Sequence, residues 1–184
     1  GQDHGDAEPA LPFRLGGRGG LGVDQVDLRQ RQHAGQRRQP RVVELELALE
    51  ARQAMRYGAF RGPRLLTCGR IVSATGPGGR FFEGMYREAD GADDVRRAVR
   101  EQLRRGADFI KVMTTGARTV ELEDPDPAQL TRAEIAIVVE EAHRQGYRVA
   151  AHAEGIDGTE IAIQEGIDTI EHGMYLHRRP DLLE

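Results

Sequence analysis

The feature that most constrains the fold is a regular alternation of helical and extended patterns over the second half of the sequence. Amphipathic helical patterns alternate with short, continuously apolar runs, and glycines separate most of them. The helical patterns cover residues 93–105, 131–146 and 158–164, and the extended runs cover residues 108–113, 148–153 and 168–172. This order predicts parallel βαβ units, and therefore an α/β fold whose sheet is largely covered on its faces.

Length limits how much of such a fold the chain can build. A complete (β/α)₈ TIM-type barrel needs about 250 residues, whereas the chain has 184. The length therefore allows a partial barrel but not a complete one. A doubly wound sheet fits the same alternation, but neither G-x-G-x-x-G nor a Walker A motif follows any of the predicted strands.

The first part of the chain differs from the remainder. Residues 1–41 are rich in Gly, Arg and Gln without helical or strand periodicity, which predicts a disordered or loosely packed segment. Residues 42–184 form the predicted incomplete barrel. Within them we expect a helix over 42–57, a buried strand over 64–68, and an irregular stretch from there to about residue 91.

Composition excludes several classes of protein. The net charge of −4 and the scattered arginines do not form the basic patch of a nucleic-acid binder. The single cysteine allows no internal disulfide, and no apolar run reaches the length of a membrane span. The first ten residues lack the pattern of a signal peptide. We therefore expect a cytoplasmic protein without a nucleic-acid or membrane partner.

Lys111 is the only lysine among the 26 basic residues of the chain. Arginine stays protonated, whereas a buried lysine can lose its proton and act as a nucleophile. Lys111, His152 and His172 each fall near the end of a predicted strand, where parallel α/β proteins place their active sites. Three consecutive βα units of a barrel would direct them toward one point, and neutral imidazoles are common ligands of zinc.

Three segments resemble motifs of the amidohydrolase superfamily. Asp108-Phe109-Ile110-Lys111-Val112-Met113-Thr114-Thr115-Gly116 resembles its carboxylated-lysine strand, Val149-Ala150-Ala151-His152-Ala153-Glu154-Gly155 its next histidine strand, and Thr169-Ile170-Glu171-His172-Gly173 its I-E-H-G motif. The upstream Gly62-Pro63-Arg64-Leu65-Leu66 and Ala89-Asp90-Gly91 are similar to the branch with Xaa-Pro dipeptidases and imidazolonepropionase-like proteins. The resemblance covers about residues 51–183, and it implies a partial (β/α)₈ TIM-type barrel containing about the middle strands.

The resemblance implies a metal-dependent hydrolase of C–N bonds in amides, dipeptides or cyclic amides, using a metal-bound hydroxide. Its substrate would be a small molecule or a dipeptide-like compound. It implies one or two Zn²⁺ ions, a CO₂-derived carbamate on Lys111 that bridges them, and His152 and His172 as further metal ligands. Thr114, Thr115 and Tyr175 are the substrate-binding residues expected from their positions beside these motifs.

Two parts of the family pattern are missing from the sequence. The first-strand His-x-His pair has no counterpart, since His4 and His33 stand alone, and the last-strand Asp cannot be assigned before Glu184. We therefore expect the chain alone to hydrolyse dipeptides poorly or not at all, and its unpaired sheet edges to favour homo-oligomers. Two alternatives stay open: a degenerate remnant without catalysis, and a barrel enzyme that uses Lys111 as a Schiff-base nucleophile.

Overall fold

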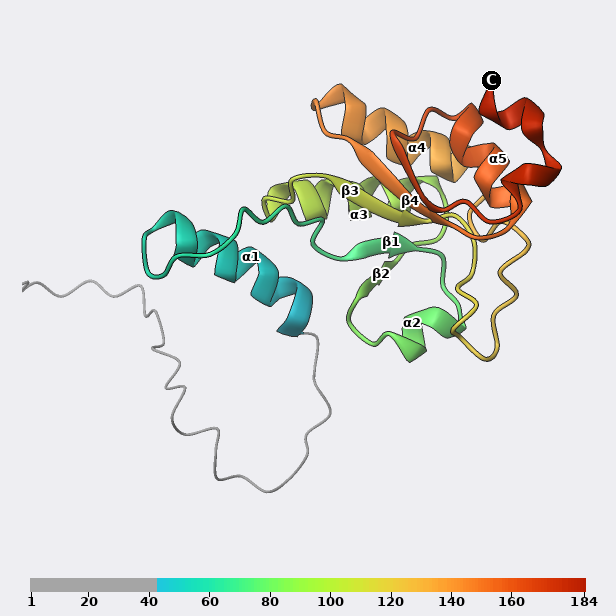
Figure 1. Cartoon of the computed structure of the whole chain (residues 1–184). Helices are drawn as coiled ribbons and strands as arrows, with labels where there is room; N and C mark the ends of the chain where they lie inside the picture. Colours follow the sequence, from blue (N-terminus) through green and yellow to red (C-terminus); the bar gives the residue numbers. More distant parts are fainter. Residues whose placement is uncertain (1–42) are drawn as a thin grey trace, which may run out of the picture. The chain divides into compact units, whose positions relative to one another are not determined.

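The computed structural model of the chain describes residues 43–184 (Figure 1). The segment predicted as disordered, residues 1–41, lies outside the described residues. The elements, in chain order, are α1 (Val43–Arg56), β1 (Ile71–Ser73), α2 (Pro77–Phe81), β2 (Tyr86–Glu88), α3 (Ala92–Arg104), β3 (Ile110–Met113), α4 (Arg132–Arg144), β4 (Val149–Ala153), α5 (Ile156–Gln164) and β5 (Thr169–His172). Two 3₁₀ helices follow, Leu176–Arg178 and Pro180–Leu183.

The five strands form one parallel sheet in the order β2-β1-β3-β4-β5. From β1 through β3 and β4 to β5, each strand is the next neighbour of the one before, and helices connect them, as in part of a TIM-type barrel. The predicted α/β fold with a partial barrel is therefore confirmed. β2 alone breaks the chain order, because it pairs with the outer edge of β1.

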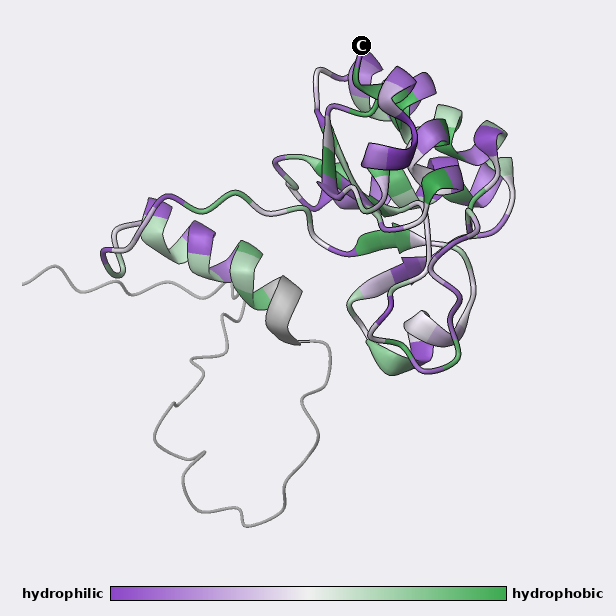
Figure 2. Cartoon of the chain, turned by 45° about the vertical axis from the view of Figure 1, so that its right-hand side comes forward, coloured by the Kyte–Doolittle hydropathy of each residue, from purple (hydrophilic) through white to green (hydrophobic). Residues whose placement is uncertain are grey.

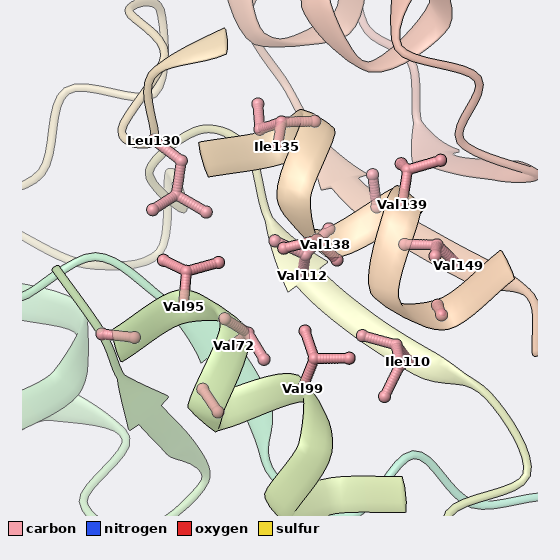
Figure 3. Close-up of a cluster of buried hydrophobic side chains, with 14 of the residues drawn as sticks. Val72, Val95, Val99, Ile110, Val112, Leu130, Ile135, Val138, Val139 and Val149 are labelled. Carbon is pink, nitrogen blue, oxygen red and sulfur yellow. The ribbon is translucent and has the colours of Figure 1, made fainter. Parts of the chain in front are cut away.

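The helices α3 and α4 cover one face of the sheet. Alternate strand residues point toward these helices and are fully buried, among them Ile110, Val112 and Val149. Figure 3 shows these side chains meeting Val99 of α3 and Val138 of α4. Since side chains alternate along a strand, Lys111 and His152 must occupy the opposite face of the sheet, which corresponds to the interior of a barrel.

The predicted beginning and end of α4 are confirmed. The Thr131 hydroxyl accepts a hydrogen bond from the Glu134 backbone N–H, and the Glu134 carboxylate accepts one from the Thr131 backbone N–H. This is the predicted capping box, and it satisfies donors that the first helical turn leaves free. The helix ends before Gly146, which adopts a positive φ of 78°.

The prediction of a strand over residues 64–68 is wrong, and the strand in this region is β1. The Thr67 backbone N–H donates to the Asp108 side chain at 2.9 Å instead of to another strand. Gly69 then turns the chain with a φ of 67°, and β1 begins two residues later. The prediction of an irregular stretch up to about residue 91 is also wrong, because this stretch contains α2 and β2.

Strand β2 has an edge position and an edge composition. Tyr86-Arg87-Glu88 is hydrophilic in Figure 2, whereas the neighbouring β1 is hydrophobic. Charged residues on an edge strand discourage pairing with another chain.

Among the described helices, none is long and apolar enough to cross a membrane.

Candidate metal centre

His152 lies near the end of β4, on the sheet face opposite to α3 and α4. It is 8% exposed, and its Nε2 lies 3.2 Å from the carbonyl oxygen of Gly116, which accepts a hydrogen bond when Nε2 carries the proton. Burial lowers the pKa of His152 below its usual value, and the charges of His172 and Lys111 act in the same direction. His152 is therefore neutral near pH 7, which is the form that binds metals.

His172 ends the neighbouring strand β5 and reaches the same site by an unusual backbone conformation. In a regular strand it would point away from the face that Glu171 occupies. His172 has a φ of 74°, which rotates its side chain out of this alternation. Its ring then contacts the ring of His152 edge-on, with 4.6 Å between the ring centroids. The structure thus brings together the two predicted histidine ligands.

Glu154, which the sequence analysis did not single out as a ligand, joins these two histidines. One ligand atom from each of His152, Glu154 and His172 lies within 4.8 Å of the other two. Oε1 of Glu154 lies 3.6 Å from Nε2 of His152. Glu154 directly follows the last residue of β4, so strand alternation does not fix the direction of its side chain, and the sequence carries no clear signal for it.

Lys111 lies on the same sheet face but has a different partner. It is buried, and its register neighbour on β4 is Ala150, two residues before His152. Its amine forms an ion pair with the carboxylate of Glu171, the residue directly opposite His152 on β5. The amine predicted as a ligand is therefore close to the two histidines along the sheet, and it is engaged by an acidic side chain.

The two threonines predicted to bind substrate are fully buried and bonded to the backbone. The Thr114 hydroxyl donates to the His152 carbonyl oxygen at 2.9 Å. The Thr115 hydroxyl donates to the Gly116 carbonyl oxygen at 2.9 Å and accepts from the Glu154 backbone N–H at 3.0 Å. Both residues hold the loops that carry the site, and a substrate contact by either stays a prediction.

Tyr175, the third predicted substrate residue, lies just after β5 and contacts two arginines. Its hydroxyl accepts a hydrogen bond from Arg118 at 2.6 Å, and the Arg118 and Arg178 guanidinium groups lie over its ring at 5.7 and 4.5 Å from the centroid. The Arg118 backbone N–H also donates to Glu154 at 3.1 Å. Tyr175 is thereby connected to the histidine cluster, and its contact with substrate stays a prediction.

The residues of this cluster fit a divalent metal. Two imidazoles and one carboxylate are a donor set that zinc uses in catalytic sites, with a fourth position open to water or substrate. The donors lie at the carboxyl ends of β4 and β5, where a barrel carries its active site. Each histidine ring is also fixed, His152 by Gly116 and His172 by its contact with His152.

Comparison with known proteins shows the family. The model of the amidohydrolase family matches residues 39–183. The chain belongs to this family. It is similar to ochratoxinase of Aspergillus niger, with 35% identity over 148 residues that cover 68% of this chain and 31% of the relative. The chain thus spans about a third of the length of the curated relatives it matches.

Solved structures of the family have the same fold. The crystal structure of A. niger ochratoxinase matches with a TM-score of 0.64 and 35% identity, over 68% of this chain and 34% of the other. A Xaa-Pro dipeptidase with methionine bound in its active site matches with a TM-score of 0.65 and 33% identity, over 73% and 36%. A prolidase complexed with N-methylphosphonate-L-proline matches with a TM-score of 0.60 and 26% identity, over 70% and 37%. Family and relatives support a hydrolase role.

Proposed function

We propose that this amidohydrolase chain provides metal-binding βα units of a divalent-metal-dependent hydrolase that cleaves C–N bonds in amides or dipeptides. The observation that carries the proposal is the convergence of His152, His172 and Glu154 at the ends of two adjacent strands. The names of the relatives agree with it, since they include a Xaa-Pro dipeptidase and a prolidase. Zinc is the metal that best matches the donor set.

A bound divalent metal would polarise a substrate carbonyl and lower the pKa of water. The residues of the chain prepare the site for it. Burial keeps His152 neutral, so a ring nitrogen can offer a lone pair. Gly116 and the contact between the rings hold both imidazoles in place. Such orientation by neighbouring groups is usual around metal ligands and raises affinity.

Lys111 has a second role in the proposal. A carbamate formed by CO₂ on its amine would add an anionic oxygen donor on the same sheet face as His152. The ion pair between Lys111 and Glu171 must open first, because carbamate formation requires a neutral amine. A Schiff-base mechanism would also use a neutral Lys111, but it gives no reason for two histidine rings in contact.

Equilibrium dialysis against zinc tests the proposal. We expect the wild-type chain to retain zinc and the double variant His152→Ala, His172→Ala to lose it. His143→Ala is the matched control, because His143 lies on α4, bonded to Asp168 and away from the cluster. Equal zinc content in the wild type and the double variant would contradict the proposal and favour a non-catalytic remnant.

Hydrolysis measurements extend this test to the reaction. Zinc-loaded and chelator-treated chains would be compared on Xaa-Pro dipeptides and on N-acyl amino acids. Any turnover should require zinc and should disappear in the double variant. Turnover that persists after chelation would show that the chemistry does not use this metal site.

A further inference from the structure

Two arginines meet at Tyr175, beside the histidine cluster. Arg118 belongs to the loop after β3 and Arg178 to the 3₁₀ helix after β5, so two segments far apart in the sequence bring them to one ring. The Arg118 guanidinium donates to the Tyr175 hydroxyl at 2.6 Å, and the Arg178 guanidinium lies 4.5 Å from the ring centroid. The electron-rich ring attracts each cation. Tyr175 thus holds two like charges close together, although they repel each other.

The backbone fixes both arginines before any ligand binds. Tyr175 has a φ of 66°, and its carbonyl oxygen accepts the Arg178 backbone N–H at 2.8 Å. The Arg118 backbone N–H donates to Glu154 at 3.1 Å, and the backbone N–H before it donates to Glu123 at 2.8 Å. Non-glycine residues with a left-handed backbone are often found at functional sites. The pair is therefore preorganised by its own loops.

The positive charge of the pair is only partly neutralised. Within the described part of the chain, Glu154 is the one carboxylate that forms an ion pair with either arginine, and its Oε2 lies 3.6 Å from Arg118 Nε. This separation exceeds that of an ordinary hydrogen bond, so most N–H donors of the 52% exposed Arg118 side chain stay open. The neighbouring Arg179 differs from Arg178, because two acidic side chains bind it. A net positive charge remains at an exposed position.

The pair lies within reach of a small molecule bound at the histidine cluster. Glu154 lies between the two, because its Oε2 faces Arg118 and its Oε1 lies 3.6 Å from His152 Nε2. A single carboxyl group thus separates a guanidinium from an imidazole. Tyr175 also follows His172 by three residues. A substrate whose amide lies at the histidines can therefore place a second group between the arginines.

We propose that Arg118 and Arg178 bind a carboxylate of the substrate, so that the site selects amides with a free carboxyl group over neutral amides. This inference rests on the proposed function, which places the scissile amide at the histidines, and it adds the group that is recognised beside that bond. Guanidinium groups form paired, charge-assisted hydrogen bonds with carboxylates. A bound carboxylate would also relieve the repulsion between the two arginines. Tyr175 acts as a positioning residue for this carboxylate, because it orients both guanidinium groups.

Binding of two matched probes to the chelator-treated full chain tests the selection, because it requires neither metal nor turnover. N-acetylproline carries the carboxylate, and N-acetylproline methylamide is its neutral counterpart. NMR titration gives the dissociation constant of each probe and follows the Nε–H signals of the arginines. The variants are Arg118→Gln and Arg178→Gln, and Arg97→Gln is the control, because Arg97 lies on α3 with its side chain 67% exposed. Circular dichroism would confirm that each variant is folded.

We expect the wild-type chain to bind the acid about 5- to 20-fold more tightly than the methylamide, as partly exposed hydrogen bonds between charged groups allow. Arg118→Gln and Arg178→Gln should each lower this ratio by about threefold or more, whereas Arg97→Gln should leave it unchanged. Tyr175→Leu should lower the ratio too, a change that a loss of stability alone would not produce. Added salt should act in the same direction, because it screens exposed charges.

Equal binding of the acid and the methylamide by the wild-type chain would overturn the inference. The same holds for a wild-type chain that binds neither probe, and for a ratio that both glutamine variants leave unchanged. These outcomes differ from failure of the proposed function, which appears as equal zinc content in the wild type and the histidine double variant. A chain that retains zinc without preferring the acid would keep the proposed metal site and lose only the carboxylate selection.

Discussion

At the scale of single residues, the candidate site depends on local backbone conformations that bring the candidate ligands to one face of the sheet. His172 and Tyr175 are the only non-glycine residues with positive φ in the described part of the chain. Such conformations are uncommon outside glycine, although His adopts them more readily than most residues. Both flank the turn that follows β5, so the unusual backbone occurs where the candidate ligands and the predicted substrate residue lie.

Gly155 is a second residue on which the site depends. A Cβ at this position would lie 2.5 Å from the carbonyl oxygen of Pro125, and closer still to that of Asp126. Its φ of −76° is open to any residue, so the requirement for glycine comes from space alone. The loop of residues 121–127 can therefore approach the end of β4 only because Gly155 has no side chain.

We predict that Gly155→Ala lowers the free energy of unfolding by about 1–3 kcal/mol, as overpacking against rigid neighbours commonly does. Gly76→Ala is the control, because a Cβ there meets its nearest atoms at ordinary contact distances. Urea denaturation measures both variants. Equal stability of the two would show that the loop moves aside at little cost.

At the scale of elements, an ion cluster around the buried carboxylate of Glu141 joins α3 to α4. The Glu141 side chain is 1% exposed and accepts hydrogen bonds from Arg96 and Arg100 of α3 and from Arg144 of α4. The hydrogen bond from Arg100, with those from Arg144 and Arg96, lowers the pKa of Glu141 from 4.5 to about 2. The helices that cover the sheet are thus joined by charge as well as by apolar contact.

This cluster predicts a pH dependence of stability. The folded pKa of Glu141 lies below its unfolded value, so the unfolded chain binds more protons between about pH 2 and 4.5. The stabilisation by Glu141 is therefore complete above pH 4.5 and is lost as the pH falls toward 2. We expect Glu141→Gln to lower the free energy of unfolding at pH 7 by about 1–3 kcal/mol, as loss of a buried hydrogen-bonded charge does.

Urea denaturation at pH 7 and at pH 3 measures this effect. The difference between wild type and Glu141→Gln should shrink at pH 3, because the Glu141 carboxyl of the unfolded wild-type chain is largely protonated there while that of the folded chain is still ionised. Glu140→Gln is the adjacent control with a 60% exposed side chain, and it should change stability by less than about 0.5 kcal/mol. An equal difference at both pH values would exclude Glu141 as the source.

The same elements show what the sequence could predict. The helices α3 and α4 were expected within two residues of their observed ends, because each has a clear apolar face and a glycine stop. The strands β3 and β4 were expected from apolar runs, and β5 from the short extended segment after the helix that Gly166 ends. Residues 64–68 have the same apolar character but form no strand, because the Asp108 side chain binds the Thr67 N–H, a tertiary contact that no local pattern reveals.

The candidate site could be predicted only in part, because local sequence patterns do not reveal its tertiary contacts either. The strand ends that carry His152 and His172 were expected side by side, but the contact between their rings also requires the positive φ of His172. The ion pair of Lys111 with Glu171 and the approach of Glu154 depend on side-chain directions and on the register of the sheet. These are fixed by packing across strands, so spacing along the chain did not indicate them.

At the scale of the whole molecule, the described residues leave β5, which carries the candidate ligand His172, at one edge of the sheet. Thr169, Glu171 and His172 are exposed, whereas every residue of β4 is buried. A ligand that joins β4 to β5 would therefore connect the most exposed strand to a fully buried one. Binding at this position should stabilise the fold, because the unfolded chain does not hold the donors together.

We predict that zinc raises the melting temperature of the full chain. A ligand present at 100 times its dissociation constant adds about 2.7 kcal/mol of stability, which corresponds to a rise of several degrees in a domain of this size. Differential scanning calorimetry with and without zinc measures the change. The double variant His152→Ala, His172→Ala should show no rise, and a rise of equal size would place the zinc elsewhere.

Anomalous diffraction at the zinc absorption edge, from crystals of the full chain grown with zinc, tests the shared metal site most directly. We predict an anomalous peak about 2.0–2.1 Å from a ring nitrogen of His152 and from a ring nitrogen of His172. No peak between these rings at saturating zinc, or a peak only at a distant residue such as His143, would contradict the account.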